Sequence, residues 1–178
     1  MSQLTLVRRV ATIGTATGLV VICFGIFALA MSARGIVKPD FSGIWIMDKN
    51  RSFNNPPGLE QTMIVKQEGD RINLDATLLL AQGERKINET WMLNGVEEQF
   101  TPQAGSPPDS KGKKKAYWLP GDRGIILNEE VTAAAGTPIS QTMRKWTLSP
   151  DGKTLIVDYF IDSPRGSYEA KRVFTKKN

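Results

Sequence analysis

Alternation of apolar and polar side chains with a period of two restricts the fold of this chain more than any other feature. The pattern is clearest over residues 71–80, where five apolar residues fall on one side of the chain: Ile72, Leu74, Ala76, Leu78 and Leu80. Successive side chains of a β-strand point to opposite faces, so the pattern predicts a strand with one buried face.

The same pattern recurs between turn residues and predicts nine strands, at residues 41–47, 61–67, 71–80, 85–93, 116–119, 124–131, 139–148, 154–162 and 167–175. Asn94-Gly95 is a strong hairpin signal, and residues 149–152 form a Ser-Pro-Asp-Gly turn. Short connections favour an all-β antiparallel meander, either closed as a barrel or folded as a β-sandwich. We favour the barrel because closure removes sheet edges.

Residues 10–33 contain no charged side chain. As a helix this stretch would reach ~36 Å, enough for a hydrocarbon core of ~30 Å. It therefore predicts one transmembrane helix before the β-domain. A signal peptide is the alternative, because Arg8 and Arg9 supply a basic start and Ala30 or Ala33 could precede a cleavage site.

The anchor interpretation divides the chain into a cytoplasmic tip (1–9), a transmembrane helix (10–33), a connector (34–40) and an exported β-domain (41–178). The basic residues on the N-terminal side predict a cytoplasmic N-terminus. In a bacterium the protein would be a single-pass protein of the inner (cytoplasmic) membrane with a periplasmic domain. Residues 101–115 are rich in Pro, Gly, Ser and Lys and predict a mobile loop.

Three glycines of the apolar stretch, Gly14, Gly18 and Gly25, fall on one face of the predicted helix. Small residues let two helices approach closely in lipid. We expect this face to pack against another membrane helix.

Composition excludes several functions. The chain has no histidine and one cysteine, Cys23, which lies in the apolar stretch. Ser-His and Cys-His nucleophile systems, thiol redox chemistry and nearly all zinc sites are thereby excluded from the β-domain. We expect no enzyme, no catalytic residue, no metal and no cofactor. Because three of the 23 basic residues flank the apolar stretch, the β-domain is close to neutral, and we expect no nucleic-acid partner.

Alternation also places three charged side chains on apolar strand faces: Glu89, Arg144 and Arg172. A charge buried alone is costly, so each should find a partner or reach water. The three could form internal ion pairs, or a polar cluster that binds an anionic or polar ligand. The acidic pair Glu129-Glu130 is interpreted more simply as part of a solvated strand end.

Four lysines, Lys111, Lys113, Lys114 and Lys115, follow the proline-rich segment. They could contact lipid headgroups or an acidic partner, or serve only solubility.

The start of the β-domain, Phe41-Ser42-Gly43-Ile44-Trp45, carries the G-x-W motif and resembles lipocalin-like barrels. The run at 146–155 also resembles a hairpin of small exported bacterial domains that begin S-G-x-W. The resemblance covers residues 41–174 and implies a lipocalin-like architecture. It also implies that Trp45 closes one barrel end with Arg172 packed across it.

Two functions are compatible with these features. The first is a non-catalytic accessory or scaffolding subunit of a larger membrane complex, for example a respiratory or photosynthetic one. It would contact membrane lipid, and other subunits through both the helix and the β-domain. The second is a lipocalin-like periplasmic binder of a small apolar ligand, which requires an open cavity lined by Leu74, Leu78, Trp91 and Tyr159.

Overall fold

The structure, a computed structural model, describes residues 38–102, 106–121 and 123–177. The predicted tip and transmembrane helix, with Gly14, Gly18 and Gly25, lie outside the described residues. Within those described ranges, no helix has the length and hydropathy needed to cross a membrane.

The β-domain is built from ten strands: β1 (Gly43–Met47), β2 (Glu60–Glu68), β3 (Arg71–Leu80), β4 (Gly83–Met92), β5 (Asn94–Phe100), β6 (Lys111–Trp118), β7 (Ile125–Thr132), β8 (Pro138–Leu148), β9 (Thr154–Ser163) and β10 (Gly166–Lys176). The predicted burial of alternate residues is confirmed in β3, where Ile72, Leu74, Ala76 and Leu78 are buried. The predicted turn at 149–152 is also present, with Gly152 at a φ of 68° and its N–H donating to the Ser149 carbonyl at 2.9 Å.

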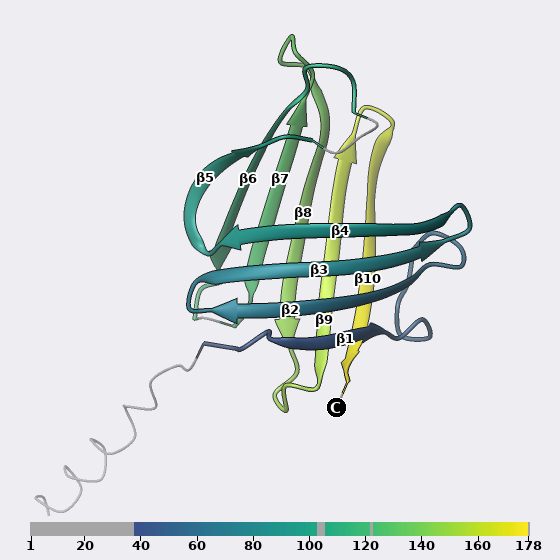
Figure 1. Cartoon of the computed structure of the whole chain (residues 1–178), viewed down its shortest axis with the longest axis vertical. Coiled ribbons are helices and arrows are strands. Elements are labelled where there is room, and N and C mark those ends of the chain that lie inside the picture. The colour runs from purple at the N-terminus through teal and green to yellow at the C-terminus, as the bar shows by residue number, and fades with distance from the viewer. Residues whose placement is uncertain (1–37, 103–105, 122, 178) are drawn as a thin grey trace, which may run out of the picture. The chain divides into compact units, whose positions relative to one another are not determined.

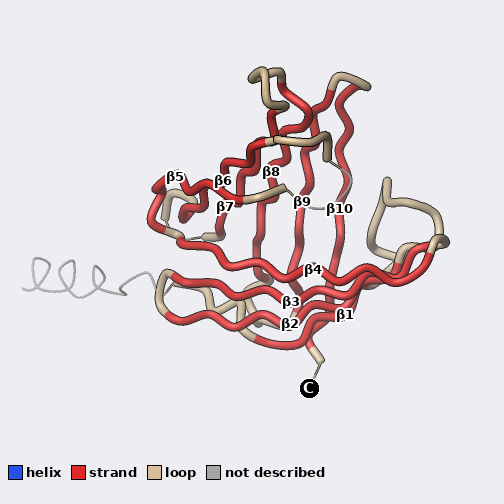
Figure 2. Tube along the Cα trace, turned by 45° about the horizontal axis from the view of Figure 1, so that its top comes forward, coloured by secondary structure: helices blue, strands red, loops and turns tan. Residues whose placement is uncertain are grey.

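All ten strands belong to one antiparallel sheet, in the order β4-β3-β2-β1-β10-β9-β8-β7-β6-β5. Pairing of β1 with β10 joins the two ends of the β-domain, as shown by the register Trp45 to Lys176. β1–β4 run across β5–β10 (Figure 1), and every regular element in the described ranges is a strand (Figure 2). The all-β meander is thus a nearly closed barrel, open only between β4 and β5.

Two local predictions are wrong. Residues 94–100 form an additional strand, and β5 pairs with β6 instead of forming a hairpin ladder with β4. The loop predicted over 101–115 is too long, because β6 begins at Lys111. Three lysines of β6 have at least one acidic residue opposite them, and Lys114 has two, Glu98 of β5 and Glu129 of β7. Opposite charges across a ladder stabilise a strand that composition alone assigns to a loop.

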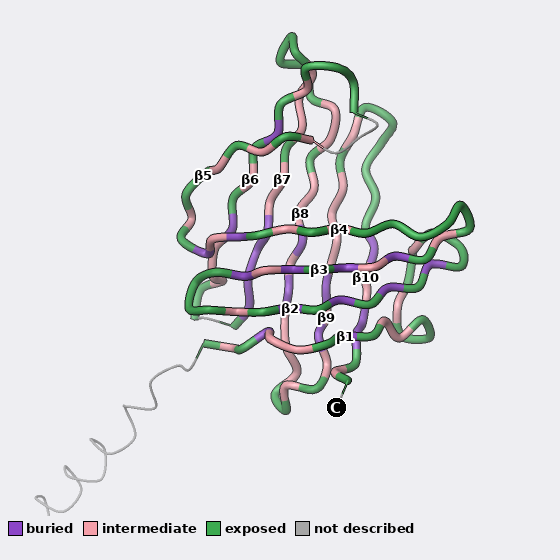
Figure 3. The backbone as a smooth tube through the Cα atoms, viewed as in Figure 1, coloured by how far each residue is buried: buried purple, intermediate pink, exposed green. Residues whose placement is uncertain are grey.

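The packed core lies at one end of the barrel. The residues with almost no exposed area include Phe41, Trp45, Ile72, Ile125, Leu127, Trp146, Leu155, Val157 and Phe174. Buried residues gather where β1–β3 cross the lower parts of β6–β10, while the upper parts of these strands are half-buried or exposed (Figure 3). Burial of this apolar surface is the main stabilising contribution, and it leaves the other half of the interior for a cavity.

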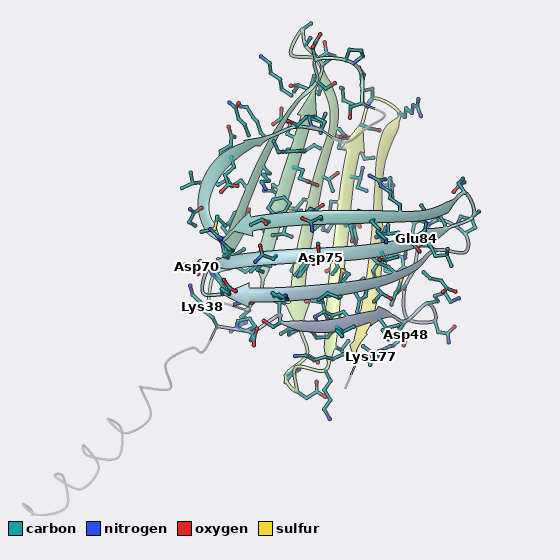
Figure 4. All side chains as sticks on the ribbon, viewed as in Figure 1. Lys38, Asp48, Asp70, Asp75, Glu84 and Lys177 are labelled. Atoms are coloured by element: carbon teal, nitrogen blue, oxygen red, sulfur yellow. The ribbon has the colours of Figure 1, made fainter. Side chains whose placement is uncertain are left out.

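Asp70, in the turn between β2 and β3, connects this end of the barrel to β6. Its carboxylate accepts a hydrogen bond from Trp118 Nε1 at 2.9 Å and pairs with Lys38 Nζ at 3.1 Å. Lys38 and Asp70 lie side by side at this turn (Figure 4). The Trp118 hydrogen bond, followed by the one from Lys38, lowers the pKa of the Asp70 carboxyl.

Candidate functional site: a polar-walled cavity in the barrel

A cavity of about 500 Å³ occupies the interior beside the packed core. Its lining comes from β2, β3 and β4 on one side and from β6–β10 on the other, with Phe100 of β5 and three residues between β5 and β6, Thr101, Pro102 and Ser106. Leu74, Leu78, Trp91 and Tyr159, which the ligand-binder hypothesis placed around a cavity, all line it.

A second hollow, of about 510 Å³, lies on β7–β10 and includes Met143, Phe160 and the acidic residues Asp162 and Glu169. Register places Asn128, Met143, Phe160 and Glu169 in one row across the four strands. This hollow has walls from neighbouring strands of one layer only. The interior cavity is enclosed by strands of both layers and is the better candidate for a ligand.

Arg172 lies on β10 and reaches into the interior cavity. Its Nε donates to Asn55 Oδ1 at 2.9 Å, and its Nη1 donates to Gln61 Oε1 at 2.7 Å and to the Tyr159 hydroxyl at 3.3 Å. Its Cζ lies 4.3 Å from the centroid of the Tyr159 ring. These contacts hold the guanidinium between the 48–59 loop, β2 and β9, and the described residues form no ion pair with it. The three bonds use Nε and Nη1, which leaves Nη2 for another acceptor.

Arg144, on β8, is held by two carboxylates. Its Nη2 lies 2.9 Å from Glu89 Oε2 and 3.2 Å from Glu129 Oε2. Glu89 Oε2 also accepts a hydrogen bond from Trp91 Nε1 at 2.9 Å, and the Arg144 Cζ lies 5.1 Å from the Trp91 ring centroid. Burial alone would lower the pKa of Arg144, but the charges of Glu89 and Glu129 outweigh it and the pKa is raised.

For the Glu129 carboxyl, burial outweighs the neighbouring cations, and its pKa is raised. Burial raises the pKa of its carboxyl and the neighbouring charge of Glu89 adds to this, while Arg144 and Lys114 act against them. The interpretation of Glu129 as part of a solvated strand end is wrong for this residue, since Glu129 lines the cavity and pairs with Arg144. The sequence does indicate that Glu129 faces the interior, because Leu127 and Val131 flank it with a period of two.

The predicted cluster of Glu89, Arg144 and Arg172 is therefore divided in two. Glu89 and Arg144 form an ion pair, whereas Arg172 lies two strands further along the wall with uncharged partners. Tyr159 lies between them, because it is directly opposite Arg144 in the β8–β9 register and accepts a hydrogen bond from Arg172. Sequence reasoning missed Asn55, Gln61 and Glu129. Gln61 carries the same period-two signal as Glu129, because it shares the buried face of β2 with Met63 and Val65, whereas Asn55 lies in a loop without such a pattern.

Trp45 is fully buried at the packed end, and its Nε1 donates to the Phe41 carbonyl at 2.9 Å. The cation over its ring is Lys176, with Nζ at 5.3 Å from the centroid. Arg172 instead lies over Tyr159. The predicted packing of Arg172 across Trp45 is thus replaced by Lys176, because Trp45 pairs with Lys176 in the β1–β10 register.

The four lysines of β6 differ in position. Lys111, Lys113 and Lys115 are exposed, and their contact with lipid or an acidic partner stays a prediction. Lys114 is half-buried, lines the cavity and donates to the Thr90 carbonyl of β4 at 2.5 Å. It thereby connects the free edge of β4 to β6 across the opening of the barrel.

No protein-family model matches the chain, and neither does any curated protein sequence. Solved structures do resemble it. A structure named as the REP1-NXSQ fatty acid transporter is 14% identical, covers 78% of this chain and 97% of its own, and gives a TM-score of 0.51. A secretary abundant heat soluble protein from Ramazzottius varieornatus is 16% identical over 79% of this chain and 98% of its own, with a TM-score of 0.50.

The apo structure of lipid binding protein 8 from Caenorhabditis elegans is also 16% identical, covers 77% of this chain and 95% of its own, and gives a TM-score of 0.50. At these identities the likeness concerns the fold alone. The β-domain has the fold of the lipocalin-like and fatty-acid-binding β-barrels.

Proposed function

We propose that the β-domain binds an amphiphilic small molecule with one anionic head, such as a long-chain carboxylic acid, in its interior cavity. The observation that carries this proposal is Arg172, a guanidinium in the cavity wall whose described partners are the uncharged groups of Asn55, Gln61 and Tyr159. A cation in that position is well suited to a carboxylate, which it can contact through charge-assisted hydrogen bonds.

The charge of the lining supports an anionic ligand. Four cationic side chains and two carboxylates line the cavity: Arg85, Lys114, Arg144, Arg172, Glu89 and Glu129. Lys114 is also paired with Glu98 of β5 at 3.7 Å, so the lining charge that an anion would compensate is that of Arg172. An anion entering the cavity would therefore reduce the charge imbalance rather than increase it.

The arrangement of polar and apolar groups suggests how such a ligand would lie. The head would accept hydrogen bonds from Arg172 Nη2 and from the Tyr159 hydroxyl. The tail would then lie along the apolar lining, which includes Leu78, Ile87 and Ile161. It cannot extend the other way, because the packed core fills that end. Two similar structures carry the names fatty acid transporter and lipid binding protein, which is consistent with this proposal.

The test is a titration of the full chain with a sixteen-carbon fatty acid, followed by displacement of a fluorescent probe. We expect Arg172→Gln to weaken binding at least tenfold, since a charge-assisted hydrogen bond contributes roughly 1.5–3 kcal/mol. Lys171→Gln is the matched control, because it removes one positive charge from the outer face of the same strand and should change affinity less than about twofold. Equal losses in both variants would contradict a specific role for Arg172.

The accessory-subunit hypothesis depends mainly on residues 10–33, which the structure does not describe, and it stays a prediction, as do the membrane partners and the periplasmic location. Membrane attachment and ligand binding are compatible in one protein. Native electrophoresis after detergent extraction tests attachment to a complex. Leu in place of Gly14 and Gly18 should weaken that association, whereas a wild-type protein that runs as a lone monomer would contradict the hypothesis.

A further inference from the structure

Arg144 and Arg172, two of the three arginines that line the cavity, differ in the groups that their guanidinium groups contact. Arg172 has amide and hydroxyl partners, while Arg144 is bonded to the carboxylates of Glu89 and Glu129. With both carboxylates ionised, the Arg144 group carries a net charge of −1. An anion at Arg172 therefore meets an attractive cation on one side and a repulsive group on the other.

The Arg144 group is held in place. Its three side chains are 8%, 16% and 24% exposed for Arg144, Glu89 and Glu129. Glu89 is positioned by Trp91, whose Nε1 donates to the same oxygen that pairs with Arg144. Ion pairs this far from solvent are screened little and keep one geometry. A ligand must therefore compete with both carboxylates to bind Arg144.

Arg144 is nonetheless close to the anion site proposed above. It is directly opposite Tyr159 on the neighbouring strand, and Tyr159 accepts a hydrogen bond from Arg172. Adjacent strands lie about 4.8 Å apart. If Arg144 lost one carboxylate, guanidinium groups on both neighbours of β9 would be available to the same ligand, and such a pair suits a head with two negative charges.

We propose that Glu89 and Glu129 determine the specificity of the cavity. They neutralise Arg144, so that Arg172 binds the ligand head without help from Arg144, and the cavity selects a head with a single negative charge over a head with two. This inference rests on the proposed binding of an anionic amphiphile and adds the residues that restrict its charge.

The first experiment compares an alkyl carboxylate with an alkyl phosphate of the same chain length at pH 7.5, where the phosphate is mostly doubly charged. Wild-type protein should prefer the carboxylate. Glu129→Gln should shift the affinity ratio at least tenfold towards the phosphate, and Glu89→Gln should act in the same direction. Glu130→Gln is the matched control, because Glu130 is exposed on the same strand, and it should leave the ratio within twofold.

The second experiment needs no lipid. We expect inorganic sulfate to raise the melting temperature of Glu129→Gln but not that of wild-type protein or of Glu130→Gln, since an anion that binds only the folded state stabilises it. An unchanged ligand ratio together with an unselective sulfate effect would overturn the inference. If wild-type protein binds no amphiphile but sulfate stabilises Glu129→Gln selectively, the proposed ligand is wrong and the neutralisation of Arg144 still stands.

Discussion

Truncation of one leucine at each end of the barrel would test whether the interior is packed at one end only. Leu155, on β9, is fully buried and faces Leu148 and Phe174 on its neighbouring strands. Leu78, on β3, is 8% exposed and lines the cavity. The two side chains are chemically identical and both lie in strands, so Leu155→Ala and Leu78→Ala differ in what surrounds the removed atoms.

The expected losses in the free energy of unfolding follow from this difference in surroundings. Each substitution removes three carbon atoms, which corresponds to about 2.4 kcal/mol of lost transfer free energy for a side chain buried on all sides. At position 155 a new void of roughly 50 Å³ would add about 1.2 kcal/mol, giving about 3.6 kcal/mol in total. At position 78 a cavity already borders the side chain, so no new enclosed void forms and the loss should stay below about 2 kcal/mol.

Urea and thermal unfolding of the full chain, followed by tryptophan fluorescence, measure both losses. At roughly 4 °C per kcal/mol for a domain of this size, Leu155→Ala should lower the melting temperature by about 14 °C and Leu78→Ala by less than about 8 °C. The affinity for a long-chain fatty acid should change more in Leu78→Ala than in Leu155→Ala. Equal stability losses at the two positions would refute the division of the interior into a packed and an open half.

Three further predictions concern the charged groups. Arg144→Met should lower the free energy of unfolding by about 3–5 kcal/mol, because it leaves Glu89 and Glu129 buried without their cation; recovery of part of this loss by Glu129→Gln in a urea double-mutant cycle would confirm the cause, and strict additivity would contradict it. Because burial raises the pKa of Glu129 above its ordinary value of 4.5, this carboxyl stabilises the fold below that value, and the contribution is lost as pH rises through the raised pKa. The stability of Glu129→Gln relative to wild type should therefore increase with pH across that window, and urea unfolding midpoints that change in parallel would argue against it. Trp118→Phe should raise the pKa of Asp70, which the indole hydrogen bond lowers, and an unchanged carboxyl titration by NMR would show that Lys38 alone is sufficient.

The fold was largely predictable because most strands show their buried face in a local alternation of apolar and polar residues; β5 and the start of β6 are the exceptions. The alternation in residues 71–80 and the turn at 149–152 are properties of adjacent residues, and both appear in the structure as expected. The placement of Glu89, Arg144 and Arg172 in the interior follows from the same parity. The side chains that face the interior could therefore be predicted without knowing which strands are neighbours.

Pairing between side chains was not predictable in the same way. Whether Arg172 packs over Trp45 or Tyr159 depends on the register of β10 with β1, which is far away in sequence, and with β9. The lysine-rich run at 111–115 forms a strand in which acidic residues of β5 and β7 lie opposite three of its lysines. Local composition contains no information on such cross-strand partners.

The joining of β1 to β10 has a consequence for how the chain folds. In the described part of the chain every other pairing connects consecutive strands and can form as soon as two of them exist. The β1–β10 pair must instead close a loop that contains almost the whole domain, and such long closures cost entropy and slow folding. Until the last strand is available, β1 stays an open edge that could pair with another chain. By pairing with β1, residues 174–176 cover this edge, and we expect their pairing to reduce aggregation during folding.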